Sequence, residues 1–166
     1  SAGEPDEMAD LRIVNKLTEE AVKPENRRCA YNGILDFKQA AAAYLQDVFG
    51  VSGMDADTEI NHSIGSKSGL ALLPHCFIHP GDVTIMTVPG YPVLGMHTQY
   101  AGGEVYNVKL TAENDYLPDL ESIPADIRRR AKLLYLNYPN NPTGAAADAR
   151  FFAEVVQFAR ENEIVV

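Results

Sequence analysis

Residues 133–144 are Leu-Leu-Tyr-Leu-Asn-Tyr-Pro-Asn-Asn-Pro-Thr-Gly, and they combine an apolar run with a proline-rich turn. An apolar run that stops at a turn with two prolines predicts a buried strand followed by a rigid polar loop at the edge of a sheet. Pro139 and Pro142 fix φ at about −65° and favour extended backbone at the residues before them, Tyr138 and Asn141. We therefore expect the loop to hold the Asn141 side chain in one direction.

The segments around this stretch alternate between strand and helix patterns. Strands are predicted at residues 58–64, 82–88, 104–110 and 132–138 and from 164 onward, and helices at 66–77, 92–100, 117–130 and 145–161. Such alternation is typical of βαβ units with right-handed crossovers and a mostly parallel sheet that helices cover on both faces. The expected fold is therefore α/β, a three-layer α-β-α sandwich.

The N-terminal part of the chain shows helical patterns only. One runs over residues 9–22, and in a second Phe37, Tyr44 and Val48 fall on one helix face, with Gly50 as the stop signal. We expect these helices to pack outside the compact core. The chain then divides into an N-terminal helical arm, residues 1–57, and a sheet domain, residues 58–166.

Composition excludes several classes of protein. The 166 residues are 46% apolar and 22% charged, as in ordinary globular proteins, and the net charge of −9 argues against a nucleic-acid binder. The most apolar window, residues 69–78, contains Pro74 and is far shorter than the ~20 residues that a bilayer requires. Cys29 and Cys76 form neither a metal motif nor a disulfide framework, which favours a reducing compartment. We expect a cytoplasmic protein that binds neither nucleic acid nor membrane.

Three loops are expected to meet at one edge of the sheet, at residues 65–68, 89–92 and 139–144. Each follows a predicted strand, and ligands of open parallel sheets bind outside the carboxyl ends of the strands. The sequence therefore predicts a ligand site built from these loops.

Each loop carries a residue with a possible binding role and a plainer alternative. Ser66 and the first helical amides can hold a phosphate with Lys67 adding charge, or Ser66 merely caps the helix and Lys67 is solvated. Tyr91 can stack on a planar ligand, or it closes the core. Asn141 can donate to and accept from a ligand oxygen, or it bonds its own turn. The residues alone leave these alternatives open.

Other chemistry finds little support in the sequence. The chain has neither a P-loop nor a G-x-G-x-x-G motif, so nucleotide folds of those types are disfavoured. The histidines lack metal-ligand spacing and an accompanying nucleophile; they are His62, His75, His79 and His97. We find no independent catalytic machinery and no metal site.

In this order the motifs resemble those of the fold-type I, pyridoxal-phosphate-dependent aminotransferases of class I/II, most closely the LL-diaminopimelate aminotransferase group. The similar stretches are Gly3-Glu4-Pro5-Asp6, Gly65-Ser66-Lys67, Val88-Pro89-Gly90-Tyr91-Pro92 and Asn137-Tyr138-Pro139-Asn140-Asn141-Pro142-Thr143-Gly144. The resemblance implies that the amides after Gly65, with Ser66 and Lys67, hold the phosphate of pyridoxal 5′-phosphate. Tyr91 would stack on the pyridine ring, and Asn141 would bond its phenolic oxygen.

The resemblance implies a substrate site and a partner as well. The Gly3 backbone would approach the substrate carboxylate. In the family a tyrosine also reaches the cofactor phosphate of the neighbouring subunit. Tyr31 lies nearby, but its spacing to Gly33 departs from the family's pattern, so we assign it no role. The implied reaction is transfer of an amino group from a small amino acid of the diaminopimelate type, in a homodimer that the N-terminal arm helps to form.

The catalytic lysine of the family and the aspartate beside the ring nitrogen match no residue of this chain. We therefore assign no catalytic residue, regard the sequence as a truncated large domain, and expect the polypeptide alone not to transaminate. Two alternatives are a non-enzymatic oligomerising or interaction module derived from an aminotransferase, and a phosphate-ligand binder of flavodoxin-like architecture.

The family's strand order, 1-7-6-5-4-2-3, has a consequence for the first predicted strand. Without strands six and seven, residues 58–64 have lost their neighbours. Because unpaired buried backbone groups are costly, we expect this strand to pair elsewhere in the shortened sheet or with another copy of the chain.

Overall fold

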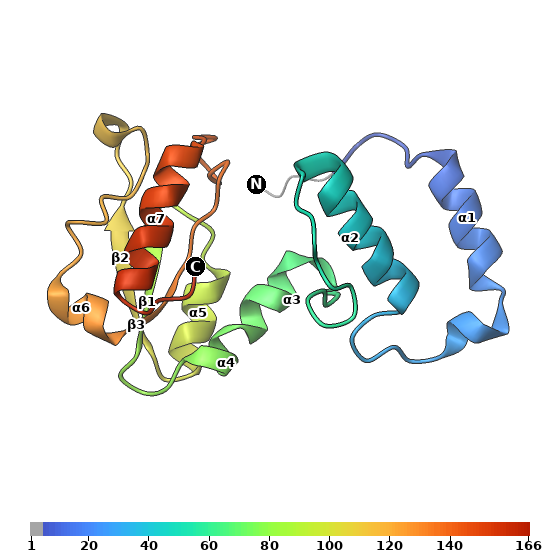
Figure 1. Ribbon diagram of the computed structural model, residues 1–166, viewed down its shortest axis with the longest axis horizontal. Helices are drawn as coiled ribbons and strands as arrows, with labels where there is room; N and C mark the ends of the chain where they lie inside the picture. Colours follow the sequence, from blue (N-terminus) through green and yellow to red (C-terminus); the bar gives the residue numbers. More distant parts are fainter. Residues whose placement is uncertain (1–4) are drawn as a thin grey trace. The chain divides into compact units, whose positions relative to one another are not determined.

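The computed structural model describes residues 5–166, which divide into two units between His62 and Ser63 (Figure 1). We call residues 5–62 the N-terminal unit and residues 63–166 the C-terminal unit, and each is described by itself.

The N-terminal unit consists of α1 (Leu11–Ala21), the 3₁₀ turn η1 (Pro24–Arg27) and α2 (Leu35–Phe49). Asp10 caps α1, because its carboxylate accepts a hydrogen bond of 2.8 Å from the backbone N–H of Arg12. Gly50 ends α2 in the left-handed conformation, with φ of +69°, and donates to the carbonyl of Gln46. Both predicted helices and the predicted stop are confirmed.

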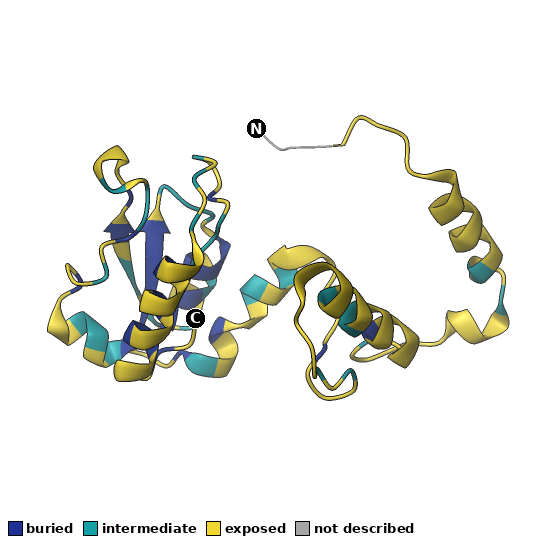
Figure 2. Cartoon of the chain, turned by 45° about the horizontal axis from the view of Figure 1, so that its top comes forward, coloured by how far each residue is buried: buried dark blue, intermediate teal, exposed yellow. Residues whose placement is uncertain are grey.

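Few side chains of the N-terminal unit are buried. Among its described residues these are Lys38 and Ile60, whereas α1 has no buried residue and is exposed except at the half-buried Glu20 (Figure 2). The Lys38 side chain is 2% exposed, and its Nζ donates a hydrogen bond of 2.9 Å to the carbonyl of Asp57. A polar contact, rather than an apolar core, therefore ties α2 to the chain that follows it.

The sheet of the C-terminal unit is parallel and has the strand order β2-β1-β3. Its strands are β1 (Val83–Val88), β2 (Glu104–Lys109) and β3 (Ala131–Leu134). Val165 bridges Leu133 on the other side of β3, and the backbone N–H of Leu134 donates to the Val165 carbonyl at 2.8 Å. The sequence of neighbours, from 165 through β3 and β1 to β2, agrees with the 5-4-2-3 part of the strand order that the resemblance implies.

Helices precede, connect and follow these strands. Before β1 are α3 (Gly65–Leu72) and α4 (Pro74–Phe77), between the strands are α5 (Val93–Tyr100), η2 (Ala112–Asn114) and α6 (Ala125–Arg130), and after β3 is α7 (Ala149–Glu161). Two predicted helices are only partly right. The one at 66–77 is interrupted before Pro74, and the connection at 117–130 is helical only from Ala125. Prolines explain both, because Pro74 starts a new helix and Pro118 and Pro124 restrict the backbone before α6.

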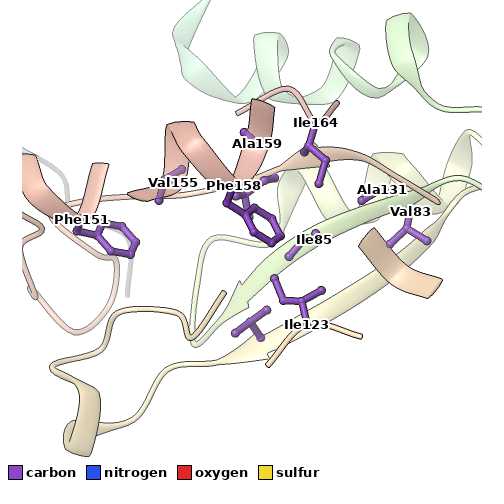
Figure 3. Close-up of a cluster of buried hydrophobic side chains, with 11 residues drawn as sticks. Val83, Ile85, Ile123, Ala131, Phe151, Val155, Phe158, Ala159 and Ile164 are labelled. Carbon is purple, nitrogen blue, oxygen red and sulfur yellow. The ribbon is translucent and has the colours of Figure 1, made fainter. Parts of the chain in front are cut away.

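Helices cover both faces of the sheet. On one face the α7 residues Val155 and Phe158 pack with Ile123 against Val83 and Ile85 of β1 (Figure 3). Alternate residues of a strand point to opposite faces, and on the other face Met86 packs with residues of α5 and of the chain after α4, Leu94 and Ile78. The expected three-layer α-β-α sandwich is confirmed in this unit.

The strand predicted at residues 58–64 is wrong. This segment forms a turn and then irregular backbone up to Gly65, and it pairs with no strand of the described chain. Local bonds replace strand pairing at its start: the backbone N–H of Glu59 donates to the Asp55 carbonyl at 2.9 Å, and the Glu59 carboxylate accepts from the Asp55 N–H at 2.7 Å. The expectation that residues 58–64 pair within the shortened sheet is therefore wrong, and their backbone groups need other hydrogen-bond partners.

Candidate functional site

A hollow of about 680 Å³ in the C-terminal unit brings the three predicted loops together. Its lining residues come from α3 and from the chain after β1 and after β3; they are Ser66, Gly69, Leu70, Leu73, Tyr91, Tyr135, Asn137, Pro139 and Asn141. Ser66, Tyr91 and Asn141 therefore share one site, as the sequence predicts. Gly65 and Lys67 adjoin it without lining it, and Gly3 lies outside the described residues.

The N-terminus of α3 offers free hydrogen-bond donors to this hollow. No side chain caps the helix, and within residues 5–166 the backbone N–H groups of Ser66 and Lys67 find no acceptor. Other hydroxyls bond the carbonyls here, since Ser63 Oγ donates to Gly65 and Ser68 Oγ to Ile64. Ser66 is therefore not the helix cap, and its exposed first-turn position suits an anion.

Gly65 enters α3 with φ of +70°, and a Cβ atom there would touch nothing within 4 Å. The conformation, and not a lack of room, is what favours glycine at this position.

Tyr91 lines the hollow from the chain that follows β1. A half-buried residue, it belongs to neither of the buried core clusters, so the alternative that it simply closes the core is disfavoured. The turn before it is tight, because a Cβ on Gly90 would lie 2.4 Å from the carbonyl oxygen of Thr87. Burial, and then the neighbouring Tyr91, raise the pKa of Tyr135, which lines the same hollow.

The loop after β3 leaves the Asn141 side chain without a bond among the described residues. Its backbone N–H donates to Asn137 Oδ1 at 3.1 Å, but the amide group itself is exposed. The turn is instead made by Asn140, whose Oδ1 accepts from Thr143 Oγ1 at 2.8 Å. The alternative that Asn141 stabilises its own turn is therefore disfavoured, and its exposed amide has both donor and acceptor available at the hollow.

Sequence reasoning missed three residues of the segment 135–138, two of which line this hollow. Tyr135 and Asn137 line it, and their spacing of two places both side chains on one face of an extended chain, a signal that the quoted stretch already contained. Tyr138 donates from its hydroxyl to the carbonyl of Tyr116 at 2.8 Å, and burial raises its pKa to about 12. Because Tyr116 is distant in the sequence, no local pattern pointed to this contact.

The arrangement suits binding better than independent catalysis. Helix-end amides, a tyrosine ring and a free amide can hold a ligand with an anionic group, a flat ring and a polar oxygen. None of the lining residues is a lysine. Within residues 5–166 no three His, Cys, Asp or Glu side chains gather where they could hold a metal ion. None of the helices in the described part of the chain is both long and apolar enough to cross a membrane.

Comparison with known proteins gives consistent matches. LL-diaminopimelate aminotransferases of Methanocaldococcus jannaschii and Methanococcus maripaludis are 60% and 51% identical to this chain over 164 residues. Each match covers 99% of this chain and 39% of the relative, so the chain spans about two fifths of their length.

Solved structures agree with the sequence matches. Substrate-bound BacF from Bacillus subtilis superposes with a TM-score of 0.94 at 39% identity, over 98% of this chain and 42% of that one. An aminotransferase from Staphylococcus aureus gives a TM-score of 0.89 at 33% identity, over 95% of this chain and 42% of that one. The family model for aminotransferase class I and II matches residues 1–166. The chain therefore belongs to the class I and II aminotransferase family.

Proposed function

We propose that this chain forms the phosphate- and ring-binding side of a pyridoxal 5′-phosphate site, in an aminotransferase that acts on an amino acid of the diaminopimelate type. The observation that carries this proposal is the meeting of the α3 N-terminus, Tyr91 and Asn141 around one hollow. The family match supports the cofactor, and the relatives' name, LL-diaminopimelate aminotransferase, supports the substrate class.

The residues of the hollow fit this cofactor group by group. Its phosphate matches the free amides of Ser66 and Lys67 at the positive end of the α3 dipole. Its pyridine ring matches the Tyr91 ring, and its phenolic oxygen matches the Asn141 amide. A volume of about 680 Å³ lies within the usual range for small-molecule sites, roughly 300–1,000 Å³.

Transamination assigns each of these residues a task. When bound, the cofactor supplies the electron sink that amino-group transfer requires. Ser66 and its neighbouring amides anchor the phosphate, Tyr91 fixes the plane of the ring, and Asn141 orients it by bonding the phenolic oxygen. Leu70 and Leu73 line the wall near α3 and keep water from it.

Proton transfer at the substrate requires a basic amine, and no residue that lines the hollow carries one. We therefore propose that the 166-residue polypeptide alone binds the cofactor but does not transaminate. An assay with LL-diaminopimelate and 2-oxoglutarate should show no turnover by the purified chain, and turnover would contradict this part of the proposal.

Calorimetric titration with pyridoxamine 5′-phosphate tests the binding proposal. Its amine does not condense with surface lysines as the aldehyde of pyridoxal 5′-phosphate does. We expect saturable binding that Ser66→Ala and Asn141→Ala each weaken about tenfold, the loss of one hydrogen bond to a charged or polar ligand group. Asn32→Ala, at an exposed asparagine of the N-terminal unit, is the matched control and should bind as the unmodified chain does. Absence of saturable binding, or equal weakening in all three variants, would overturn the proposal.

An oligomerising role is the second candidate, and the exposed apolar side chains of the N-terminal unit favour it. On α1 alone these are Leu11, Ile13, Val14 and Leu17. We propose that residues 1–57 form a dimer contact with a second copy of the chain, that residues 58–166 belong to the cofactor domain, and that the second copy also supplies a neighbour for residues 58–64. Sedimentation equilibrium should give a dimer, and a monomer at tens of micromolar would contradict this candidate.

A further inference from the structure

We propose that Asn140 is a positioning residue that connects the loop of residues 139–144, the Asn141 loop, to the loop of residues 89–92, the Tyr91 loop. This inference rests on the proposed function, because it concerns how the two ring-binding residues are held relative to each other. Asn140 itself does not line the hollow.

Asn140 is almost completely buried, with 3% of its surface exposed, whereas the adjacent Asn141 is exposed. All of its polar groups have partners. Its backbone N–H donates to the Ala145 carbonyl at 2.8 Å, and its carbonyl accepts from Gly144 at 2.7 Å. Its Oδ1 accepts from Thr143 Oγ1 at 2.8 Å and from the Thr143 backbone N–H at 3.4 Å.

The remaining hydrogen bond of Asn140 leads outside its own loop. Asn140 Nδ2 donates to the carbonyl of Pro89 at 3.5 Å, across 51 residues of sequence. The other bonds close the loop of residues 140–145, and this one connects that loop to the chain that leaves β1. Although the bond is long, a buried amide that turned away from Pro89 would lose its only acceptor, which is costly.

The Pro89 carbonyl is a sensitive point on the Tyr91 loop. It belongs to the peptide that leads into Gly90, where a Cβ would lie 2.4 Å from the Thr87 carbonyl and the turn has no spare room. Fixing the orientation of that peptide fixes the direction in which the chain presents Tyr91, the next residue. Asn140 therefore fixes the position of Tyr91 relative to Asn141.

Asparagine suits both tasks because its short side chain carries an acceptor and a donor together. Aspartate would keep the acceptor for Thr143 but would present a second oxygen to the Pro89 carbonyl. Asn137 completes the arrangement from the other side, since its Oδ1 accepts from the Asn141 backbone. The two amides hold the backbone of Asn141 and leave its side chain free for a ligand.

Two variants separate the bonds of Asn140. Asn140→Asp removes the donor to Pro89 and keeps the acceptor for Thr143, whereas Thr143→Val removes the hydroxyl contact and keeps the bond to Pro89. In ¹H–¹⁵N spectra of the ligand-free chain, Asn140→Asp should shift the Gly90 and Tyr91 amides, and Thr143→Val should act within residues 140–145. Asn32→Asp makes the same change of charge at an exposed residue of the N-terminal unit and is the control. Unchanged Gly90 and Tyr91 signals in Asn140→Asp would overturn the inference.

The unmodified chain provides a readout that does not depend on the folding of a variant. The side-chain amide protons of Asn140 should exchange with solvent more slowly than those of Asn141 and show nuclear Overhauser effects to Pro89. Equal exchange of the two amides, without such effects, would also overturn the inference.

Binding provides the functional readout. Asn140→Asp should weaken pyridoxamine 5′-phosphate about tenfold and Thr143→Val less, because only the first change releases Tyr91. If the unmodified chain fails to bind, the proposed function fails, and the spectra of the ligand-free chain still decide whether Asn140 positions Tyr91. If binding occurs and Asn140→Asp leaves it unchanged, the inference alone fails.

Discussion

Residues 63–166 and residues 5–62 differ in where their apolar side chains lie. In the C-terminal unit β1 is buried between two clusters of side chains, and Ile85 has no exposed surface. In the N-terminal unit Ile13 of α1 is 67% exposed, and the most buried side chain is a lysine, Lys38 (Figure 2). The C-terminal unit has its own apolar core, so the loops at its strand ends are held by a rigid sheet. The helices of the N-terminal unit need a partner surface to bury their apolar faces, which is the physical basis of the proposed dimer contact.

The largest effect that separates the two units should come from one substitution made in each. Ile85→Ala removes buried methyl groups from the core of the C-terminal unit and should lower the free energy of unfolding by about 2–5 kcal/mol. Ile13→Ala makes the same change on an exposed face of α1 and should alter it by less than about 0.5 kcal/mol. Urea unfolding followed by circular dichroism measures both, at a concentration where the chain is monomeric. Equal losses would mean that α1 is packed like the sheet, and the contrast between the units would be lost.

A smaller effect should appear at the hydroxyl of Tyr138. Tyr138→Phe removes its hydrogen bond to the Tyr116 carbonyl and should cost about 1 kcal/mol of stability at neutral pH. Tyr31→Phe, in the N-terminal unit, is the control, since Tyr31 is 99% exposed and should lose nothing.

The pH dependence of this tyrosine has a defined sign. Burial raises the pKa of Tyr138 from its ordinary 10.0 to about 12, so the folded state holds the proton more tightly than the unfolded state. The contribution of protonated Tyr138 to the free energy of unfolding is complete below pH 10 and is lost as the pH rises toward 12. The unfolding free energy of the unmodified chain should therefore fall more steeply over this range than that of Tyr138→Phe. Parallel curves would show that Tyr138 makes no such contribution.

The smallest effect should come from the charged face of α1. Glu20 contacts Lys16 at 2.7 Å and Lys23 at 2.8 Å, and these ammonium groups, Lys16 first, lower the pKa of Glu20 from 4.5 to about 2. A lowered pKa stabilises the folded form above pH 4.5, and this support is lost as the pH falls toward 2. Helical Cα chemical shifts of residues 16–23 should weaken over that range, and less so in 1 M salt, which screens exposed pairs.

Glu20→Gln should flatten this acid transition and leave the C-terminal unit unchanged. A transition that persists in Glu20→Gln would assign it to another group.

The sequence predicted best those elements that local patterns determine. The strand and loop at 133–144, the strands β1 and β2 and the helices α5 and α7 are found close to their expected positions, because apolar runs, glycines and prolines mark them locally. Tyr91 and Asn141 meet as predicted, because they follow the parallel strands β1 and β3, whose carboxyl ends lie at one edge. Ser66 lines the same hollow although no strand precedes it within residues 5–65.

What failed depends on contacts between distant residues. The run at 58–64 has a strand pattern, yet a strand forms only beside a neighbour, and Asp55 and Glu59 bond one another's backbone instead. Asn140 was overlooked because two adjacent asparagines look alike in sequence, and only the fold buries one and exposes the other. The proposed dimer contact and the cytoplasmic location stay predictions.

The most direct test of the proposed cofactor side is a ¹H–¹⁵N titration of the chain with pyridoxamine 5′-phosphate. We predict that the largest shifts fall on the amides of Ser66, Lys67, Tyr91 and Asn141, with none in α1. The C-terminal unit has another hollow, of about 440 Å³, between residues 117–121 and α7, which provides an internal comparison. Shifts that centre on that hollow, or no shifts at saturating ligand, would contradict the assignment of the site at the ends of β1 and β3.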